Sequence, residues 1–319
     1  MSYLLRLGRA RATSVDLDYC PFDIESDPAK FGLTTVRVPT PYGNIAVRLS
    51  NERYSDVGTM FIHGVGADWS TWTPLLRAMR ELGTPAHDQL FVDMPGFGDS
   101  ENKLGVLDIA DVGSALLDVA SALGYKKLRI VGHSMGGFLT LDMASRYPGS
   151  ILSIHLVAGP YFSILASIQY PLRSLLHSPE VGIVFGAQYW ISRTGEFGLA
   201  ALRLTCQLGV FKYLLYPFAS HPLQLRTTVI KALCRQQNPQ GMIQTAANGP
   251  GYDADRQWGK IRCPIVAVFG DKDHLVPQAD LMRLVECQPR AKCSTLADSG
   301  HLMHIEWPTK VLRALELSD

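Results

Sequence analysis

The stretch Ile130-Val131-Gly132-His133-Ser134-Met135-Gly136-Gly137 decides both how this chain folds and where its chemistry lies. Just before it, Lys127 to Val131 forms the short apolar run that is typical of a buried strand. Just after it, residues 138–144 have the apolar spacing of a helix, which stops at Pro148. The octet therefore predicts a sharp turn between a strand and a helix.

A serine at the tip of such a turn is a candidate nucleophile. Gly132 and Gly136 flank Ser134 with residues that lack a Cβ, so the chain can turn tightly and the hydroxyl can project. The same pattern also occurs around inert serines in tight turns. The strand before it and the helix after it favour the nucleophile.

A serine hydroxyl needs a base to take its proton, and the base needs a carboxylate to orient its ring. Both residue types follow apolar runs later in the chain. The loop Gly270-Asp271-Lys272-Asp273-His274 comes after one run, and Asp298-Ser299-Gly300-His301 comes after the last. The order serine, aspartate, histidine is the one that accompanies a serine between strand and helix. His301 is thus the candidate base, and Asp271 and Asp273 are both candidate acids.

Eight short apolar runs predict the strands of a sheet. From the third run onward they alternate with helical segments. Residues 71–82 are predicted to form one helix, and the clearest helix is 108–123, which Asp108 can cap and Gly124 can end. This alternation predicts an α/β fold with a mostly parallel sheet flanked by helices, and the first two runs predict an antiparallel hairpin at one edge. The runs are Thr34–Val38, Ile45–Leu49, Thr59–Ile62, Leu90–Asp93, Leu128–Val131, Ile151–Val157, Ile265–Phe269 and Ser294–Leu296.

The strand pattern stops after the sixth run. Residues 160–257 are rich in Leu, Tyr and Phe and are broken by prolines, which predicts a helical cap inserted between the two core segments 1–159 and 258–319. Some apolar side chains of this cap should face the substrate. The stretch from Gly149 to Leu172 has no charged side chain and is long enough to span a bilayer, but Gly159-Pro160 interrupts it, so no membrane span is expected.

Composition limits the classes of function. The chain has 319 residues with 47% hydrophobic, and its 30 basic and 29 acidic side chains nearly cancel, so no net field favours nucleic acid or an anionic membrane. The six cysteines are scattered along the chain and show no disulfide framework, so we expect them to be reduced thiols. Residues 1–11 lack the apolar core of a secretory signal, so we expect a cytoplasmic protein. A homo-oligomer remains possible.

With these motifs the chain resembles the α/β-hydrolase superfamily in its capped form, over nearly its whole length. The resemblance implies an α/β-hydrolase fold, with a mostly parallel eight-stranded sheet and a helical cap after strand 6. Four motifs carry it, in the family's order: His63-Gly64-Val65-Gly66, then Asp93-Met94-Pro95-Gly96-Phe97-Gly98-Asp99-Ser100, then Gly270, Asp273 and Pro277, and finally Gly300, His301, Glu306 and Pro308.

The resemblance also implies roles for single residues. It assigns Asp273, three residues past Gly270, as the acid, with Asp271 as the competitor. Some relatives place the acid after the sixth strand, but residues 157–161 contain no carboxylate. The backbone N–H groups of Val65 and Met135 are expected to form the oxyanion hole.

Three other histidines receive lesser roles. His63 is expected to support the oxyanion loop, and His133 to pack or to form a hydrogen bond locally. His301 and His304 have the spacing of a metal-binding pair, but no further ligands stand at a useful spacing. We therefore expect no metal and no cofactor.

The expected reaction is a two-step acyl transfer through an acyl-enzyme on Ser134. The expected substrate is a carboxylic ester or lactone of a small apolar molecule. Serine at this turn argues against the haloalkane dehalogenases and epoxide hydrolases of the superfamily, which have Asp there. Two alternatives stay open: a carbon–carbon bond hydrolase of vinylogous diketones (meta-cleavage products), and a ligand receptor that retains the fold and the triad.

Overall fold

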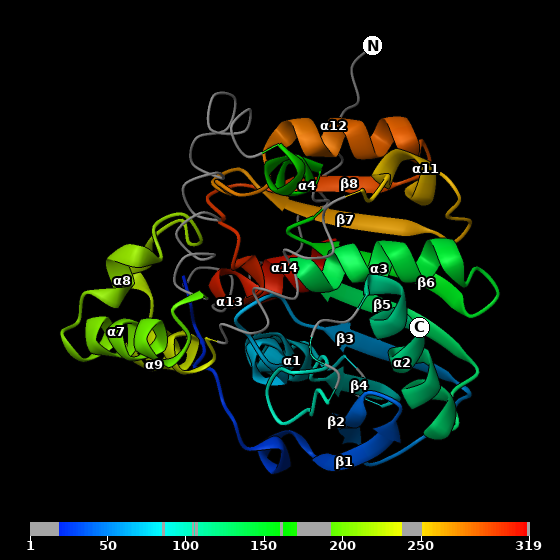
Figure 1. Ribbon diagram of the computed structural model, residues 1–319, viewed down its shortest axis with the longest axis horizontal. Coiled ribbons are helices and arrows are strands. Elements are labelled where there is room, and N and C mark those ends of the chain that lie inside the picture. The colour runs from blue at the N-terminus through cyan, green and yellow to red at the C-terminus, as the bar shows by residue number, and fades with distance from the viewer. Residues whose placement is uncertain are drawn as a thin grey trace.

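The computed structural model describes residues 19–84, 87–103, 105, 108–159, 162–170, 193–237 and 251–317. Its centre is an eight-stranded sheet in the order β1-β2-β4-β3-β5-β6-β7-β8 (Figure 1). β2 pairs antiparallel with β1 and β4, and every other neighbouring pair is parallel. The strands are β1 (Leu33–Thr40), β2 (Gly43–Ser50), β3 (Val57–Ile62), β4 (Gln89–Val92), β5 (Lys127–His133), β6 (Ile151–Val157), β7 (Ile265–Gly270) and β8 (Lys292–Leu296).

The predicted fold class is confirmed. Each of the eight apolar runs overlaps one strand, and the first two form the antiparallel hairpin at the edge of the sheet. Because β3 and β5 to β8 are parallel, the loops that follow their carboxyl ends meet at one edge of the sheet. The loops after β3, β4, β5, β7 and β8 carry the motifs, and β4 is parallel to β3.

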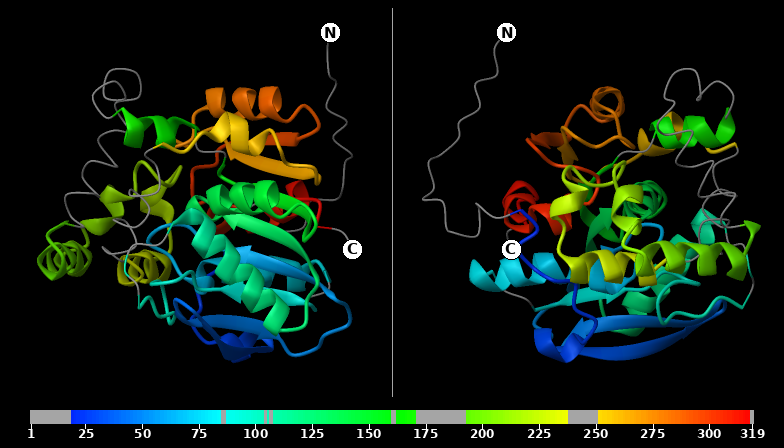
Figure 2. Two further views of the ribbon diagram at one scale, coloured as in Figure 1. Left: turned by 45° about the vertical axis from the view of Figure 1, so that its right-hand side comes forward. Right: turned by 90° about the vertical axis from the view of Figure 1, so that its left-hand side faces the viewer.

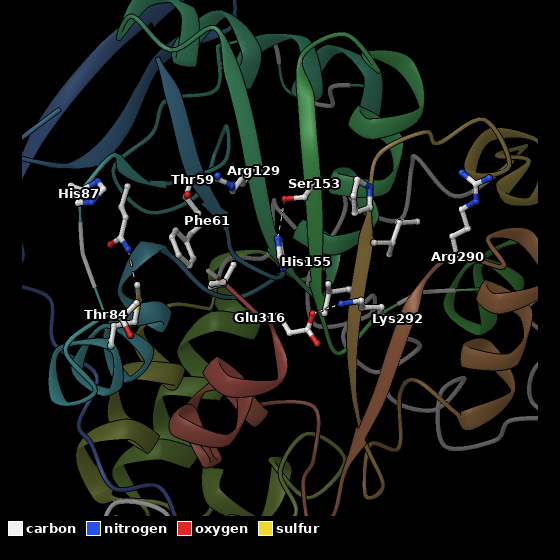
Figure 3. A pocket seen from close by; sticks show the side chains of 16 residues that line it. Thr59, Phe61, Thr84, His87, Arg129, Ser153, His155, Arg290, Lys292 and Glu316 are labelled. Atoms are coloured by element: carbon white, nitrogen blue, oxygen red, sulfur yellow. Dashed lines mark hydrogen bonds and ion pairs between the residues drawn. The ribbon is translucent and has the colours of Figure 1, made fainter. Parts of the chain in front are cut away.

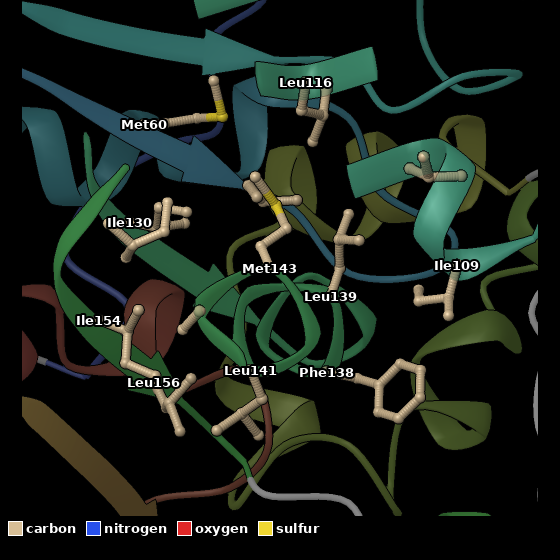
Figure 4. Close-up of a cluster of buried hydrophobic side chains, with 14 of the residues drawn as sticks. Met60, Ile109, Leu116, Ile130, Phe138, Leu139, Leu141, Met143, Ile154 and Leu156 are labelled. Atoms are coloured by element: carbon tan, nitrogen blue, oxygen red, sulfur yellow. The ribbon is translucent and has the colours of Figure 1, made fainter. Parts of the chain in front are cut away.

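Period-two alternation gives the sheet two apolar faces. In β5, for example, Ile130 belongs to one core cluster and Val131 to the other. On the first face lie α2 (Ile109–Ala122), α3 (Met135–Arg146), α11 (Ala254–Trp258) and α12 (Gln278–Cys287). On the second lie α1 (Thr73–Glu81), α13 (Met303–Glu306) and α14 (Pro308–Ala314). Figure 4 shows the first core, where Leu139, Leu141 and Met143 of α3 lie among side chains of α2 and the strands.

The helix boundaries follow local chemistry. The carboxylate of Asp108 accepts the N–H of Ala110 at the start of α2, as predicted, and Gly124 follows its end with a φ of 89°. The helix expected from residue 71 begins differently. A 3-10 turn, η3 (Trp69–Trp72), is capped by Asp68, and the α-helix α1 starts only at Thr73, with Pro74 in its first turn, where the missing N–H does no harm.

In the described residues between β6 and β7, all the regular elements are helices. They are α4 (Phe162–Gln169), α7 (Glu196–Gln207), α8 (Phe211–Leu214), η4 (Pro222–Gln224), α9 (Thr227–Arg235) and α11. A third apolar cluster joins Phe211, Leu215 and Leu233 to Leu302 and Ile305, so α8 and α9 are attached to the segment that follows β8. Figure 2 shows α7, α8 and α9 as a layer that projects beyond the sheet. Because residues 160–161, 171–192 and 238–250 are outside the described part, the cap boundaries 160 and 257 stay predictions.

The charge-free stretch from Gly149 to Leu172 does not form one long helix. Its described residues form the buried strand β6 and the short helix α4. In the described ranges, no helix combines the length and the apolarity that crossing a bilayer requires. The expectation for residues 1–11 lies outside the described residues.

Candidate active site

Ser134 occupies a strained turn between β5 and α3. Its φ of 51° and ψ of −129° are a conformation that residues other than glycine rarely adopt. The flanking glycines allow the turn. A Cβ on Gly132 would lie 2.5 Å from the carbonyl oxygen of Gly136, and a Cβ on Gly136 would lie 2.2 Å from that of Ile62. The tight approach predicted from the motif is therefore present, and it fixes Ser134 at the edge of the sheet.

A continuous hydrogen-bond chain joins three of the predicted site residues. His301 Nε2 lies 2.9 Å from Ser134 Oγ, and His301 Nδ1 lies 2.9 Å from Asp273 Oδ2. The side chains of His301 and Asp273 are only 3% and 1% exposed. An ionised carboxylate can only accept, so Asp273 fixes the ring proton on Nδ1 and leaves Nε2 free to accept the serine hydroxyl. This arrangement can deprotonate Ser134.

Asp273 is itself held by its loop. Its Oδ1 accepts the backbone N–H groups of Leu275 at 2.8 Å and Val276 at 3.1 Å, so the other oxygen is aimed at His301. Asp271 is exposed, and its Oδ1 accepts the N–H of Ser299 at 3.1 Å. The structure therefore brings Asp273 to His301, whereas Asp271 joins the loops after β7 and β8.

Three hydrogen bonds hold the backbone around His301. Gly300 N–H donates to Glu306 Oε2 at 3.0 Å, Leu302 N–H donates to the carbonyl of Phe218 at 3.0 Å, and His133 Nε2 donates to the carbonyl of His301 at 3.0 Å. His133 thus forms a hydrogen bond, but its partner is 168 positions away along the chain rather than local.

Glu306 connects this loop to the helical layer. Besides Gly300 N–H, its Oε2 accepts the N–H and the hydroxyl of Ser220, at 3.1 and 2.6 Å. Burial raises the pKa of Glu306. Sequence reasoning found Glu306 only as a member of a motif. Its contact with Ser220 joins residues 86 positions apart, and no local pattern in the sequence predicts such a contact.

The loop after β3 contacts the serine turn. A Cβ on Gly64 would lie 2.8 Å from the Cβ of Ser134, so the backbone that leads to Val65 passes directly over the serine. His63 Nε2 accepts the N–H of Met94 at 3.1 Å, so its Nδ1 carries the proton and donates to the carbonyl of Gly64 at 2.8 Å. Burial lowers the pKa of His63 and keeps it neutral. Met135, the other expected oxyanion residue, is the first residue of α3.

His133 and His304 form a buried pair behind His301. Their ring centroids are 4.2 Å apart, and His304 Nε2 lies 2.8 Å from Thr71 Oγ1. Burial lowers the pKa of His304 to about 3 and that of His133 well below its ordinary value, with neighbouring histidines adding to both shifts. Both rings are thus neutral near pH 7. Among the described residues, no group of three His, Cys, Asp or Glu side chains is arranged to hold a metal ion.

The helical layer covers one side of the site. The ring of Phe218 lies 6.4 Å from that of His301, and the ring of Tyr216 stacks on His274 at 6.1 Å. On the opposite side, Gln237 Nε2 reaches the carbonyl of Gly66 at 3.5 Å. Residues from α8 to the end of α9 therefore contact the loops that follow both β3 and β8.

A separate cavity lies at the other end of the sheet. Its volume is about 270 Å³, and residues near the amino ends of the strands line it, among them Thr59, Arg129, Ser153 and Lys292 (Figure 3). It contains none of Ser134, Asp273 and His301. Since the motif-bearing loops follow the carboxyl ends of the strands, this cavity is not part of the candidate site.

Known proteins resemble this chain in sequence. It is 27% identical over 265 residues to a probable lysophospholipase, BODYGUARD 2, of Arabidopsis thaliana, a match that covers 76% of this chain and 54% of the plant protein. It is 24% identical over 281 residues to a putative carbamate hydrolase, RutD, of Escherichia coli O17:K52:H18, a match that covers 86% and 91% of the two chains. The chain thus spans about half the length of the plant relative.

Solved structures resemble it in fold. The carboxylesterase CesB (YbfK) of Bacillus subtilis superposes with a TM-score of 0.65 at 19% identity, over 90% of this chain and 92% of that one. At this identity the likeness concerns the fold alone. The family model for the alpha/beta hydrolase fold matches residues 60–308, which run from β3 to the start of α14 and include all four motifs. On this evidence the chain belongs to the α/β-hydrolase fold family.

Proposed function

We propose that this protein is a serine hydrolase that cleaves a carboxylic ester or lactone of an apolar small molecule. One observation carries the proposal: the chain of two 2.9 Å hydrogen bonds from Asp273 through His301 to Ser134. In this proposal Ser134 is the nucleophile, His301 is the general base and then acid, and Asp273 orients His301.

The first half of the reaction acylates the enzyme. His301 Nε2 takes the hydroxyl proton as Ser134 Oγ attacks the carbonyl carbon, and the carbonyl oxygen becomes an oxyanion. When the tetrahedral intermediate collapses, the bond to the leaving oxygen breaks, and His301 gives the proton to the departing alcohol. The Asp273 carboxylate stabilises the imidazolium that exists between these two transfers. The second half repeats the sequence with water as the nucleophile and releases the acid.

The oxyanion is proposed to bind the backbone N–H groups of Val65 and Met135. Two observations support this: the loop before Val65 lies against Ser134, and Met135 begins α3, where the helix dipole favours a negative charge. His63 holds the loop through its hydrogen bonds to Gly64 and Met94, so the donor would be in place before the substrate arrives.

The substrate class is inferred from the surroundings and from the relatives. We propose that residues 160–257 form the cap, and the Phe218 ring beside His301 suits an apolar acyl or alcohol group. The plant relative is named a probable lysophospholipase and the Bacillus structure a carboxylesterase. These names support an ester as the substrate.

The test is hydrolysis of a short aryl ester by the parent and by Ser134→Ala. We expect the substitution to lower kcat/KM by about 10⁴-fold or more, because the nucleophile is lost. Ser121→Ala, at an exposed position in α2, is the control and should match the parent. A folded Ser134→Ala protein that turns over the ester at the parent rate rules out the assignment. Parallel assays with a lactone and a vinylogous diketone identify the preferred substrate class.

A further inference from the structure

The outer face of α7 exposes large apolar side chains. Phe197, Leu204 and Leu208 are 79%, 52% and 68% exposed, and their spacing of seven and four residues places them on one side of the helix and the turn that ends it. The opposite side of α7 is already used, since Leu199 is buried and Leu202 packs against the third core cluster. The inner face of α7 is apolar because it packs in the core, and the outer face is apolar although nothing in the fold requires it.

Exposed apolar residues continue along the chain into α8 and η4. Of the fourteen large apolar side chains that are exposed in the described residues, eight lie between positions 197 and 223. Single exposed apolar residues are ordinary on a protein surface, but a concentration of them marks an interaction site. Besides the three on the face of α7 they are Val210, Tyr213, Leu214, Tyr216 and Leu223.

The same segment is strongly basic. The balanced charge of the whole chain conceals this, because residues 193–237 hold six Lys or Arg side chains and one Glu. Arg203 of α7 and Lys231 and Arg235 of α9 are exposed, and none of the three forms an ion pair with another residue of the described part. The right-hand view of Figure 2 shows α7, α8 and α9 together on one side of the molecule.

We propose that the outer surface of α7 and α8, called here the α7–α8 surface and formed by Phe197, Arg203, Leu204, Leu208, Tyr213 and Leu214, docks on an anionic lipid bilayer. Exposed apolar side chains interleaved with cations are what an interfacial helix needs, because the apolar groups enter the acyl boundary and the cations bind lipid phosphates. A second copy of this chain fits less well, since it would set one basic surface against another.

The α7–α8 surface is connected to the candidate active site. A few residues past α8, Phe218 lies beside His301, and a Cβ on Gly300 would lie 2.6 Å from the backbone N of Ser220. Docking would therefore hold the segment beside His301 near the lipid, so the substrate would be an acyl ester that partitions into the membrane. This last step rests on the proposed function, whereas the docking itself does not.

Co-sedimentation with lipid vesicles tests the docking. The full chain is mixed with vesicles of phosphatidylcholine and phosphatidylglycerol in equal parts, or of phosphatidylcholine alone. We expect binding to the anionic vesicles to be about tenfold tighter or more, and to weaken in high salt. The variant Phe197→Ser/Leu204→Ser/Leu208→Ser and the variant Arg203→Glu should each weaken this binding by about tenfold or more.

The matched control is Tyr54→Ser/Met282→Ser, which removes two exposed apolar side chains far from α7 along the chain and should bind like the parent. Thermal unfolding midpoints show whether each variant is folded. The docking proposal is overturned if the parent does not bind anionic vesicles, if the folded apolar variant and the folded Arg203→Glu variant both bind as tightly as the parent, or if the α7 residues instead mediate a concentration-dependent dimer. Aryl ester hydrolysis without vesicles reports on the proposed function separately, so the two failures can be told apart.

Discussion

Asp271 and Asp273 are only two positions apart, yet they make different contacts at this site. Asp273 has one oxygen on the N–H groups of Leu275 and Val276 and the other on His301, whereas Asp271 contacts only the backbone of the next loop. Composition alone could not separate them, because both are acidic and both follow β7. The spacing from Gly270, taken from the family resemblance, favoured Asp273, and its role as the acid stays a prediction.

Exchanging each aspartate for its amide tests that prediction. Asp273→Asn should lower kcat for the aryl ester by about 10⁴-fold, because an amide at this position favours the wrong ring tautomer of His301. Asp271→Asn is the matched control and should stay within a few fold of the parent. Steady-state kinetics on both variants decides the matter, and the opposite ranking would assign the acid to Asp271.

The buried pair His133 and His304 makes stability depend on pH. In the folded chain the pKa of His304 is about 3, whereas an unfolded histidine has a pKa of about 6.5. Between these values the unfolded chain binds the extra proton, so stability is complete above about pH 6.5 and falls as the pH decreases toward 3.

Replacing His304 should make the free energy of unfolding less sensitive to low pH. Between about pH 7 and pH 5, the free energy of unfolding of the parent should fall by about 2 kcal/mol more than that of His304→Asn. Urea unfolding at the two pH values measures the difference. Equal losses in both proteins would show that His304 is not a buried neutral histidine.

At the scale of elements, the turn between β5 and α3 depends on close backbone packing. The carbonyl of Ile62 in β3 occupies the space where a Cβ on Gly136 would lie, 2.2 Å away. The glycine is therefore required by the neighbouring strand, as well as by the tight turn itself.

Gly136→Ala should lower the free energy of unfolding by about 3 kcal/mol, because backbone atoms of two elements must separate to admit one methyl group. Gly149→Ala is the matched control: nothing lies within 4 Å of its added Cβ and its φ is not positive, so the change should stay within about 0.5 kcal/mol. Denaturant titration compares the two. Similar stability for both variants would mean that the contact with Ile62 is not close.

The elements were largely predictable because their signals are local. Short apolar runs predicted the strands, and Asp108 and Gly124 predicted the ends of α2. The predicted start of α1 was two residues too early. Asp68 caps a 3-10 turn first, and the α-helix begins after it, with Pro74 in its first turn. The strained backbone of Ser134 follows from its motif, but the contacts that hold His301 join distant segments and leave no local signal.

At the scale of the whole molecule, Glu306 joins the helical layer to the loop of His301. One oxygen of its buried carboxylate accepts three hydrogen bonds, one from Gly300 and two from Ser220. The segment around Ser220 and the backbone next to His301 are therefore held by the same carboxylate oxygen. The sequence predicted a cap at residues 160–257 but not how its helices lie against the loop of His301, because that arrangement depends on such long-range contacts.

Removing the Glu306 carboxylate should weaken that connection. Glu306→Ala leaves buried N–H groups unpaired, which should destabilise the fold by about 2–3 kcal/mol and lower kcat more than it raises KM. Glu306→Gln keeps an acceptor oxygen and should recover most of kcat. Glu316→Ala, at an exposed ion pair, is the control. If kcat is unchanged in a folded Glu306→Ala protein, Glu306 does not position His301.

Acylation of Ser134 is the step on which the proposed reaction depends most. The most direct measurement is rapid quenching of the protein with an activated aryl ester, followed by peptide mass spectrometry. We predict one acyl group per chain, on the peptide that contains Ser134, and accumulation of this species when Asp273 and His301 are intact. An acyl group on a different residue, or ester turnover that persists in the folded Ser134→Ala protein, would show that Ser134 is not the nucleophile.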